Sequence, residues 1–122
     1  MNVLLGIGGS DDSLRALSQT IERAKTAGDD LTVAVLENPE SERGTDEVES
    51  RVHEELDDAG FDAEVRRVTG DPGSELVDLA ETEGFDQIVL GGGQRSPMGK
   101  IRLGHISEFV LLNSPVTVTL VR

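Results

Sequence analysis

Short apolar runs alternate with amphipathic stretches along the whole chain. The runs end at glycine or at polar residues, as the strands of a sheet do. The amphipathic stretches repeat apolar residues every three or four positions, which is the period of a helix that packs one face on a core. The pattern predicts five strands, at about 2–7, 31–37, 62–68, 87–91 and 115–121, with four helices between them, the last from about 104 to 113.

Two of the predicted helices carry recognisable end signals. Ser10 precedes the first amphipathic stretch, where its hydroxyl can accept a hydrogen bond from a free amide, and Gly28 follows it as a C-terminal cap. Asp71 and Pro72 stand before the third stretch, as N-cap and first helical residue. These signals support the helical assignment independently of the apolar pattern.

Strands that alternate with helices predict an α/β fold in which helices cover both faces of a five-stranded parallel sheet. At 122 residues the chain is expected to form a single domain over residues 1–122. Ligands of such sheets bind at the carboxyl ends of the strands, where the strand order reverses. Two strands lead directly into glycine clusters, at residues 8–9 and 91–93, so both clusters are expected to face one crevice.

The charge of the chain limits its partners. A formal net charge of −13 argues against nucleic acid and anionic membranes, because like charges would have to meet. The acidic surface, with nine arginines but only Lys25 and Lys100, predicts a salt-loving host, a halophilic archaeon. No cysteine is present, no apolar run approaches a membrane span, and the N-terminus is unlike a signal peptide, so a cytoplasmic location is expected.

One glycine loop contrasts with this acidic background. No acid occurs from Gly91 to His105, whereas Arg95, Lys100 and Arg102 do. Backbone amides of such a loop, followed by the positive end of a helix dipole at about Gly104, form the usual physical basis of an anion site. The loop is therefore interpreted as a phosphate site, and a flexible connection whose basic residues pair with nearby acids is the alternative.

Two familiar phosphate motifs are absent. A P-loop would need glycine at Gln94 and a hydroxyl residue at Ile101. The dinucleotide fingerprint begins at Gly6 and Gly8 but has Asp11 in place of its third glycine. A phospho-receiver domain is disfavoured as well, because no lysine follows the last strand.

Four segments together resemble the universal stress protein family over essentially the whole chain. They are "VLLGIGGSDDSLRAL", "GDPGSELVDLA", "DQIVLGGG" and "LGHISEFVLLNSPVTVTLVR". The resemblance implies a sheet of strand order 3-2-1-4-5, a homodimer formed through the C-terminal strand, and a role in the stress response. The alternating β-branched residues of "VTVTLV" are typical of an edge strand that pairs with a partner.

Nucleotide-binding members of that family carry G-x2-G-x9-G-S/T after the fourth strand, wrapped around the phosphates of ATP. Gly91 and Gly104 match the first and third glycines, whereas Gln94 and His105 replace the second glycine and the hydroxyl residue. Gly8 stands where members usually carry an aspartate that contacts the nucleoside. The phosphate loop is therefore a degenerate form of the family's motif.

Together the residues and the resemblance predict one small-anion site and no catalytic or metal-ligating residue. ATP or AMP is the expected ligand, with Mg²⁺ accompanying a triphosphate, in a domain that binds and regulates. The alternative is a family member that has lost nucleotide binding and acts as a dimeric interaction module. Asp11 and Asp12 are interpreted as helix-end charges, with Mg²⁺ binding as the alternative. The predicted site residues are Gly8, Gly9, Ser10, Gly91, Gln94, Arg95, Lys100, Gly104, His105 and Ser107.

Overall fold

The computed structural model describes residues 1–39, 41–92, 94–95, 101–102 and 104–121. In chain order its elements are β1 (Asn2–Ile7), α1 (Asp11–Ala27), β2 (Asp30–Leu36), α2 (Thr45–Ala59), β3 (Glu64–Val68), α3 (Pro72–Thr82), β4 (Gln87–Gly91), β5 (Gln94–Arg95), β6 (Ile101–Arg102), α4 (His105–Asn113) and β7 (Thr117–Val121). Five of the strands form one parallel sheet in the order β3-β2-β1-β4-β7. Because β7 is the fifth strand of the sequence prediction, the predicted fold class and the order 3-2-1-4-5 are confirmed.

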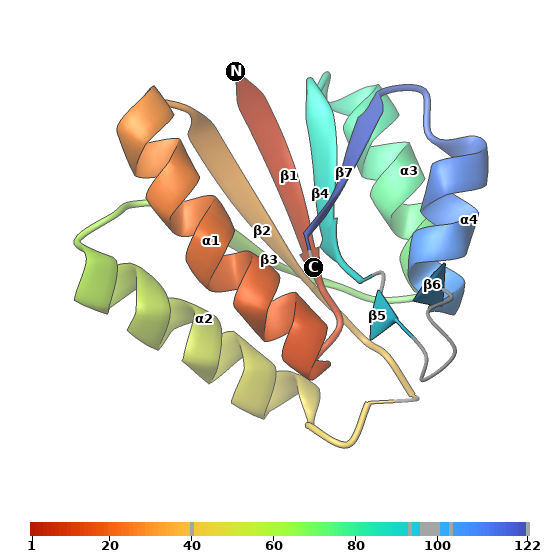
Figure 1. Ribbon diagram of the computed structural model, residues 1–122, viewed down its shortest axis with the longest axis horizontal. Helices are drawn as coiled ribbons and strands as arrows, with labels where there is room; N and C mark the ends of the chain where they lie inside the picture. The colour runs from red at the N-terminus through yellow and green to blue at the C-terminus, as the bar shows by residue number, and fades with distance from the viewer. Residues whose placement is uncertain (40, 93, 96–100, 103, 122) are drawn as a thin grey trace.

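The helices cover both faces of the sheet, α1 and α2 on one and α3 and α4 on the other (Figure 1). The central strand β1 supplies both cores: Val3, Leu5 and Ile7 pack towards α1 and α2, while Leu4 packs towards α3 and α4. This explains why β1 reads as a continuous apolar run, since neither face of a covered strand meets water. No helix of the described residues is long and apolar enough to cross a membrane.

The predicted ends of α1 are confirmed. Ser10 is the N-cap, and its Oγ accepts a hydrogen bond from the amide of Ser13 at 3.1 Å. Gly28 ends the helix in the left-handed conformation and donates its N–H to the carbonyl of Ala24. The strand that precedes Ser10 and the helix that follows it therefore meet at a well-defined turn beside the carboxyl end of β1.

Asp71 caps α3 as predicted, with Oδ2 accepting from the amide of Ser74 at 3.1 Å and Pro72 in the first turn. Replacing Asp71 with alanine is expected to lower the free energy of unfolding by about 1 kcal/mol, because an amide of the first turn loses its acceptor. Denaturant unfolding measures the change. Asp78→Ala, which removes the same charge from the exposed middle of α3, is the control; equal losses in the two variants would contradict the capping role.

The fifth strand of the sheet begins later than its sequence pattern predicts. The apolar alternation starts at about 115, whereas β7 starts at Thr117. The hydroxyl of Ser114 donates to the carbonyl of Val116 at 2.8 Å and accepts from its amide at 3.1 Å. Because this turn occupies both backbone groups of Val116, ladder pairing begins only at the following residue.

Candidate functional site

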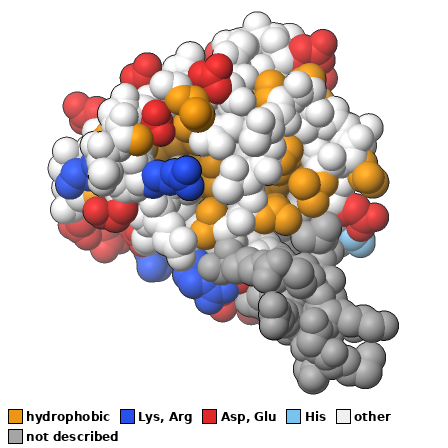
Figure 2. Space-filling view, turned by 45° about the horizontal axis from the view of Figure 1, so that its top comes forward, with side chains coloured by type: hydrophobic (Ala, Val, Ile, Leu, Met, Phe, Trp, Pro, Cys, Tyr) orange, Lys and Arg blue, Asp and Glu red, His pale blue; other side chains and the backbone are white. Residues whose placement is uncertain are grey.

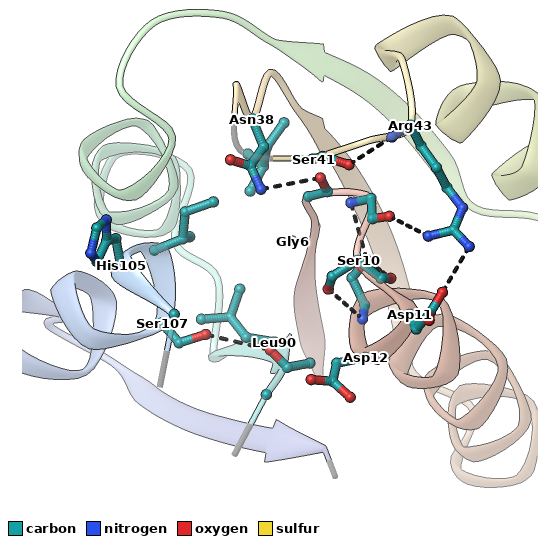
Figure 3. A pocket seen from close by; sticks show the side chains of 18 of the residues that line it. Gly6, Ser10, Asp11, Asp12, Asn38, Ser41, Arg43, Leu90, His105 and Ser107 are labelled. Carbon is teal, nitrogen blue, oxygen red and sulfur yellow. Dashed lines mark hydrogen bonds and ion pairs between the residues drawn. The ribbon is translucent and has the colours of Figure 1, made fainter. Parts of the chain in front are cut away.

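A cavity of about 750 Å³ opens at the carboxyl ends of β1 and β4, between the loops that follow these strands (Figure 3). Its volume falls within the roughly 300–1,000 Å³ that is typical of ligand pockets. The sheet therefore brings both glycine loops to one cavity, as the crevice prediction required. The predicted site residues that line it are Gly8, Gly9, Ser10, Gly91, Gly104, His105 and Ser107.

The remaining predicted residues lie between β4 and α4. Gln94 and Arg95 form β5, which pairs antiparallel with Ile101 and Arg102 of β6. Lys100 lies outside the described residues. The sequence analysis predicted a loop between β4 and α4 without strands, and this prediction is wrong at residues 94–95 and 101–102. Strands of two residues are too short to produce a recognisable alternation.

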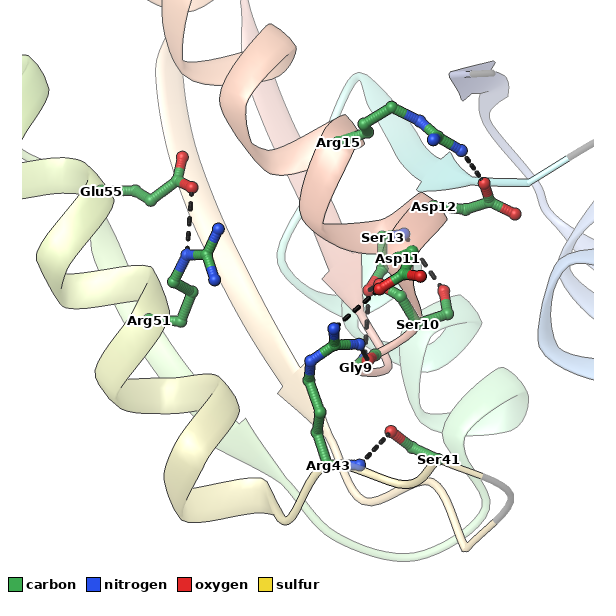
Figure 4. A network of polar contacts seen from close by, with 10 residues as sticks. All are labelled: Gly9, Ser10, Asp11, Asp12, Ser13, Arg15, Ser41, Arg43, Arg51 and Glu55. Carbon is green, nitrogen blue, oxygen red and sulfur yellow. Dashed lines mark hydrogen bonds and ion pairs between the residues drawn. The ribbon is translucent and has the colours of Figure 1, made fainter.

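Two serine hydroxyls bond to backbone groups at the start of α1. Besides the Ser10 cap, the hydroxyl of Ser13 donates to the carbonyl of Ser10 at 2.8 Å and accepts from the amide of Gly9 at 3.1 Å (Figure 4). The side-chain oxygen of Ser10 is therefore already engaged with its own helix. An anion at this end of the cavity would have to compete with these internal bonds.

The start of α4 is different. Its N-cap is Gly104, with φ −70° and ψ 165°, and no side chain of the described residues caps the helix. These angles suit a serine or an aspartate equally well, and a Cβ added at Gly104 would meet no described atom within 4 Å. The hydroxyl of Ser107 turns towards the carbonyl of Gly91 at 3.4 Å. The first residues of α4, from Gly104 to Ser107, therefore line the cavity at a helix start that has no side-chain cap from the described residues.

Close packing against α1 leaves no room for a side chain at Gly91. A Cβ at this position would lie 2.5 Å from the carbonyl carbon of Asp12 and 2.7 Å from the amide nitrogen of Ser13. Both atoms belong to the backbone of the first turn of α1, which cannot move aside as a flexible side chain can. The glycine therefore allows β4 to end directly against the start of α1, and thereby shapes the floor of the cavity.

Charge divides the described part of the cavity into two ends. Four carboxylates line it, those of Asp11, Asp12, Glu42 and Glu47, whereas Arg43 is the one Lys or Arg side chain on the described lining. Arg43 is already paired with Asp11 at 2.7 Å. Glu42 and Glu47 add negative charge from the β2–α2 side, whereas the described lining residues at the α4 end include no acid, so an anion is favoured at the α4 end.

The two acids in the first turn of α1 form ion pairs with arginines. Asp11 pairs with Arg43, and Asp12 pairs with Arg15. Among the residues that the structure describes, no group of three or more histidine, aspartate or glutamate side chains is arranged to hold a metal ion. Both acids lie in the first turn of α1, where the helix-end interpretation places them.

The segment between β2 and α2 supplies a wall that the sequence analysis missed. Asn38, Ser41 and Arg43 line the cavity from this side, opposite His105 in Figure 3. A signal was present, since a strand next to β1 in a parallel sheet ends at the same edge as β1 does. Residues that directly follow the second strand were therefore candidates for the site.

The comparisons with known sequences agree with one another. The model of the universal stress protein family matches residues 1–122. Universal stress protein MJ0577 of Methanocaldococcus jannaschii is 34% identical over 97 residues, which cover 75% of this chain and 60% of that protein. The match thus spans less than two thirds of the length of this relative.

Solved structures show the same architecture. A universal stress protein from Archaeoglobus fulgidus superposes with a TM-score of 0.80 at 23% identity, covering 100% of this chain and 98% of that one. At this identity the likeness concerns the fold alone. A universal stress protein crystallised in complex with cAMP gives a TM-score of 0.76 at 29% identity, covering 100% of this chain and 96% of that one.

Proposed function

Because the chain belongs to the universal stress protein family, as its resemblance indicated, we propose that it binds an adenine nucleotide such as AMP or ATP in the cavity between β1 and β4. The observation that carries the proposal is the start of α4, where a glycine N-cap without a side-chain cap from the described residues opens onto that cavity. The related structure at 29% identity, which is in complex with cAMP, supports an adenosine phosphate as the ligand.

The cavity suggests how such a ligand would lie. Its phosphate would accept hydrogen bonds from the first amides of α4, at His105, Ile106 and Ser107, where the helix dipole is positive. The opposite end carries carboxylates, which repel phosphate but accept hydrogen bonds from ribose hydroxyls or an exocyclic amine. Leu36 and Leu90 add apolar lining for the faces of the base.

We further infer binding and regulation without turnover. Hydrolysis of a nucleotide needs a positioned base or water and cations that neutralise the leaving charge. Of the four carboxylates that line the cavity, those of Asp11 and Asp12 are paired with Arg43 and Arg15. His105 is exposed at the start of α4, where its backbone amide, in this proposal, has the binding role. Slow or absent hydrolysis of ATP is therefore expected.

Calorimetric titration tests the proposal. AMP, ADP and ATP with Mg²⁺ are titrated into the protein in molar KCl, which screens the net charge of −13. We expect at least one nucleotide to bind with a dissociation constant in the micromolar range, about −8 kcal/mol, and adenosine to bind more weakly because it lacks the phosphate. A folded protein that produces no heat up to millimolar nucleotide would contradict nucleotide binding.

A homodimer formed through β7 is the second proposal, and it does not depend on a nucleotide. β7 is an edge strand of the sheet, and the neighbouring helix α4 exposes Leu111 (40%) and Leu112 (77%). Figure 2 shows several apolar side chains close together on the right-hand half of the face, where Figure 1 places β7 and α4. Exposed apolar groups beside an open strand edge favour association with a second copy.

Sedimentation velocity measures this association. The chain has a mass of 13.0 kDa, and a species of twice that mass is expected at micromolar concentration, with or without nucleotide. A monomer under all conditions would contradict the dimer. A dimer that binds no nucleotide would favour the alternative function, a dimeric interaction module.

A further inference from the structure

We propose that Arg43 is a positioning residue of the nucleotide cavity, because it fastens the segment between β2 and α2 to the loop between β1 and α1. The described part of this segment, residues 37–39 and 41–44, is called the β2–α2 segment below. The inference rests on the proposed function in one respect, since the expected change in nucleotide affinity requires that the chain binds a nucleotide. The fastening itself rests on contacts within the chain.

One guanidinium contacts both the β1–α1 loop and the first residue of α1 (Figure 4). Nη1 of Arg43 donates to the carbonyl of Gly9 at 2.8 Å, and Nη2 donates to Oδ1 of Asp11 at 2.7 Å. The amide of Arg43 also donates to Oγ of Ser41 at 3.2 Å, which ties the arginine to its own segment. The planar fork of arginine can bridge a carbonyl and a carboxylate in this way, and the single ammonium of lysine cannot hold the same geometry.

The glycines that follow β1 make room for this contact. Gly9 has φ +95°, and a Cβ there would lie 3.1 Å from Cγ2 of Val48 and still closer to Oγ of Ser41. A Cβ on Gly8 would lie 3.2 Å from Nδ2 of Asn38. That amide nitrogen also donates to the carbonyl of Gly8 at 3.4 Å (Figure 3). The absence of side chains at Gly8 and Gly9 thus allows the β2–α2 segment to pack directly against the β1–α1 loop.

The fastening fixes one wall of the cavity. Asn38 and Ser41 line the cavity beside Arg43, so their positions depend on where the β2–α2 segment lies. Arg43 and Asp11 are 36% and 77% exposed, so their ion pair contributes little by itself, and the bond to the Gly9 carbonyl gives the contact its direction. A wall held in place before binding reduces the ordering cost that the ligand must otherwise offset.

The test compares two arginines of similar surroundings. Arg51 also pairs with an acid, Glu55 at 3.3 Å, and is exposed, but it does not line the nucleotide cavity (Figure 4). We expect Arg43→Ala to weaken AMP binding about tenfold and Arg51→Ala to change it less than about twofold. Arg43→Lys is expected to resemble Arg43→Ala, since the charge remains but the bridge is lost.

Two further readouts separate positioning from a general loss of structure. In this proposal the base lies against Leu36, which directly precedes the β2–α2 segment. Ribose 5-phosphate lacks the base, so its affinity should change less than about twofold in Arg43→Ala. Hydrogen exchange, measured without ligand, should become faster at the amides of Ser41 and Arg43 in Arg43→Ala but not in Arg51→Ala.

Each outcome decides the proposal. Unchanged AMP affinity in Arg43→Ala, or equal losses in Arg43→Ala and Arg51→Ala, would overturn it. If the unmodified chain binds no AMP, the proposed function fails. The hydrogen-exchange rates then test on their own whether Arg43 fastens the β2–α2 segment. Faster exchange confined to Arg43→Ala supports the fastening in that case, and unchanged exchange overturns it.

Discussion

Replacing Gly91 with alanine is expected to lower the free energy of unfolding by about 3 kcal/mol, at the upper end of what overpacking a well-filled interior usually costs. The new Cβ would lie 2.5 Å from the carbonyl carbon of Asp12 and 2.7 Å from the amide nitrogen of Ser13. Real Cβ atoms do not approach backbone so closely, so β4 or the first turn of α1 must shift. Either shift also moves the residues at the ends of β4 and α1 that line the cavity.

Chemical denaturation of Gly91→Ala measures the change, with Gly44→Ala as the matched control. Gly44 is a glycine with φ −70° at the start of α2, where an added Cβ meets no described atom within 4 Å. The free energy of unfolding of the control should fall by no more than about 1 kcal/mol, which is the usual effect of a poorer N-cap. Equal losses at the two positions would show that the backbone contact of Gly91 does not matter.

Replacing Gly104 with aspartate is expected to weaken AMP binding at least about 100-fold, or about 2.7 kcal/mol, without destabilising the fold. Aspartate is a favourable N-cap, and the backbone angles of Gly104 accept it, so α4 should gain a few tenths of a kcal/mol. The same carboxylate would occupy the amides that the phosphate needs and would repel its charge. Stability and binding should therefore change in opposite directions.

Calorimetry and denaturation of the same sample measure both effects. Ser74→Asp is the control, because it adds the same charge in the first turn of α3, a helix that does not line the cavity. Gly104→Asn separates the two causes of lost binding, since asparagine caps the helix without adding charge. Undiminished AMP affinity in Gly104→Asp would move the phosphate away from α4.

The repeating features of the fold could be predicted from the sequence. Apolar runs without alternation identified the covered strands, and side-chain caps such as Ser10 and Asp71 identified helix starts, because both signals lie in neighbouring residues. The pair β5 and β6 was missed, since two-residue strands leave no period. The start of β7 was misplaced by the Ser114 turn, which depends on one hydroxyl and not on apolarity.

The candidate site could be predicted only where neighbouring residues in the sequence carry a signal. The glycines after β1 and β4 stood out by composition, and the structure places both clusters at one cavity. The role of Gly91 in packing could not be predicted, because its close neighbours in α1 lie far away in the sequence. The contact of Arg43 with Gly9 joins residues 34 positions apart, and no local pattern marks it.

Amide chemical shifts test the central claim most directly. The claim is that the start of α4 receives the phosphate of an adenine nucleotide. In a titration of ¹⁵N-labelled protein with AMP, the largest shifts are predicted at the amides of His105, Ile106 and Ser107, and adenosine should not reproduce them. Shifts that are largest elsewhere, or that adenosine reproduces at these three amides, would contradict the account.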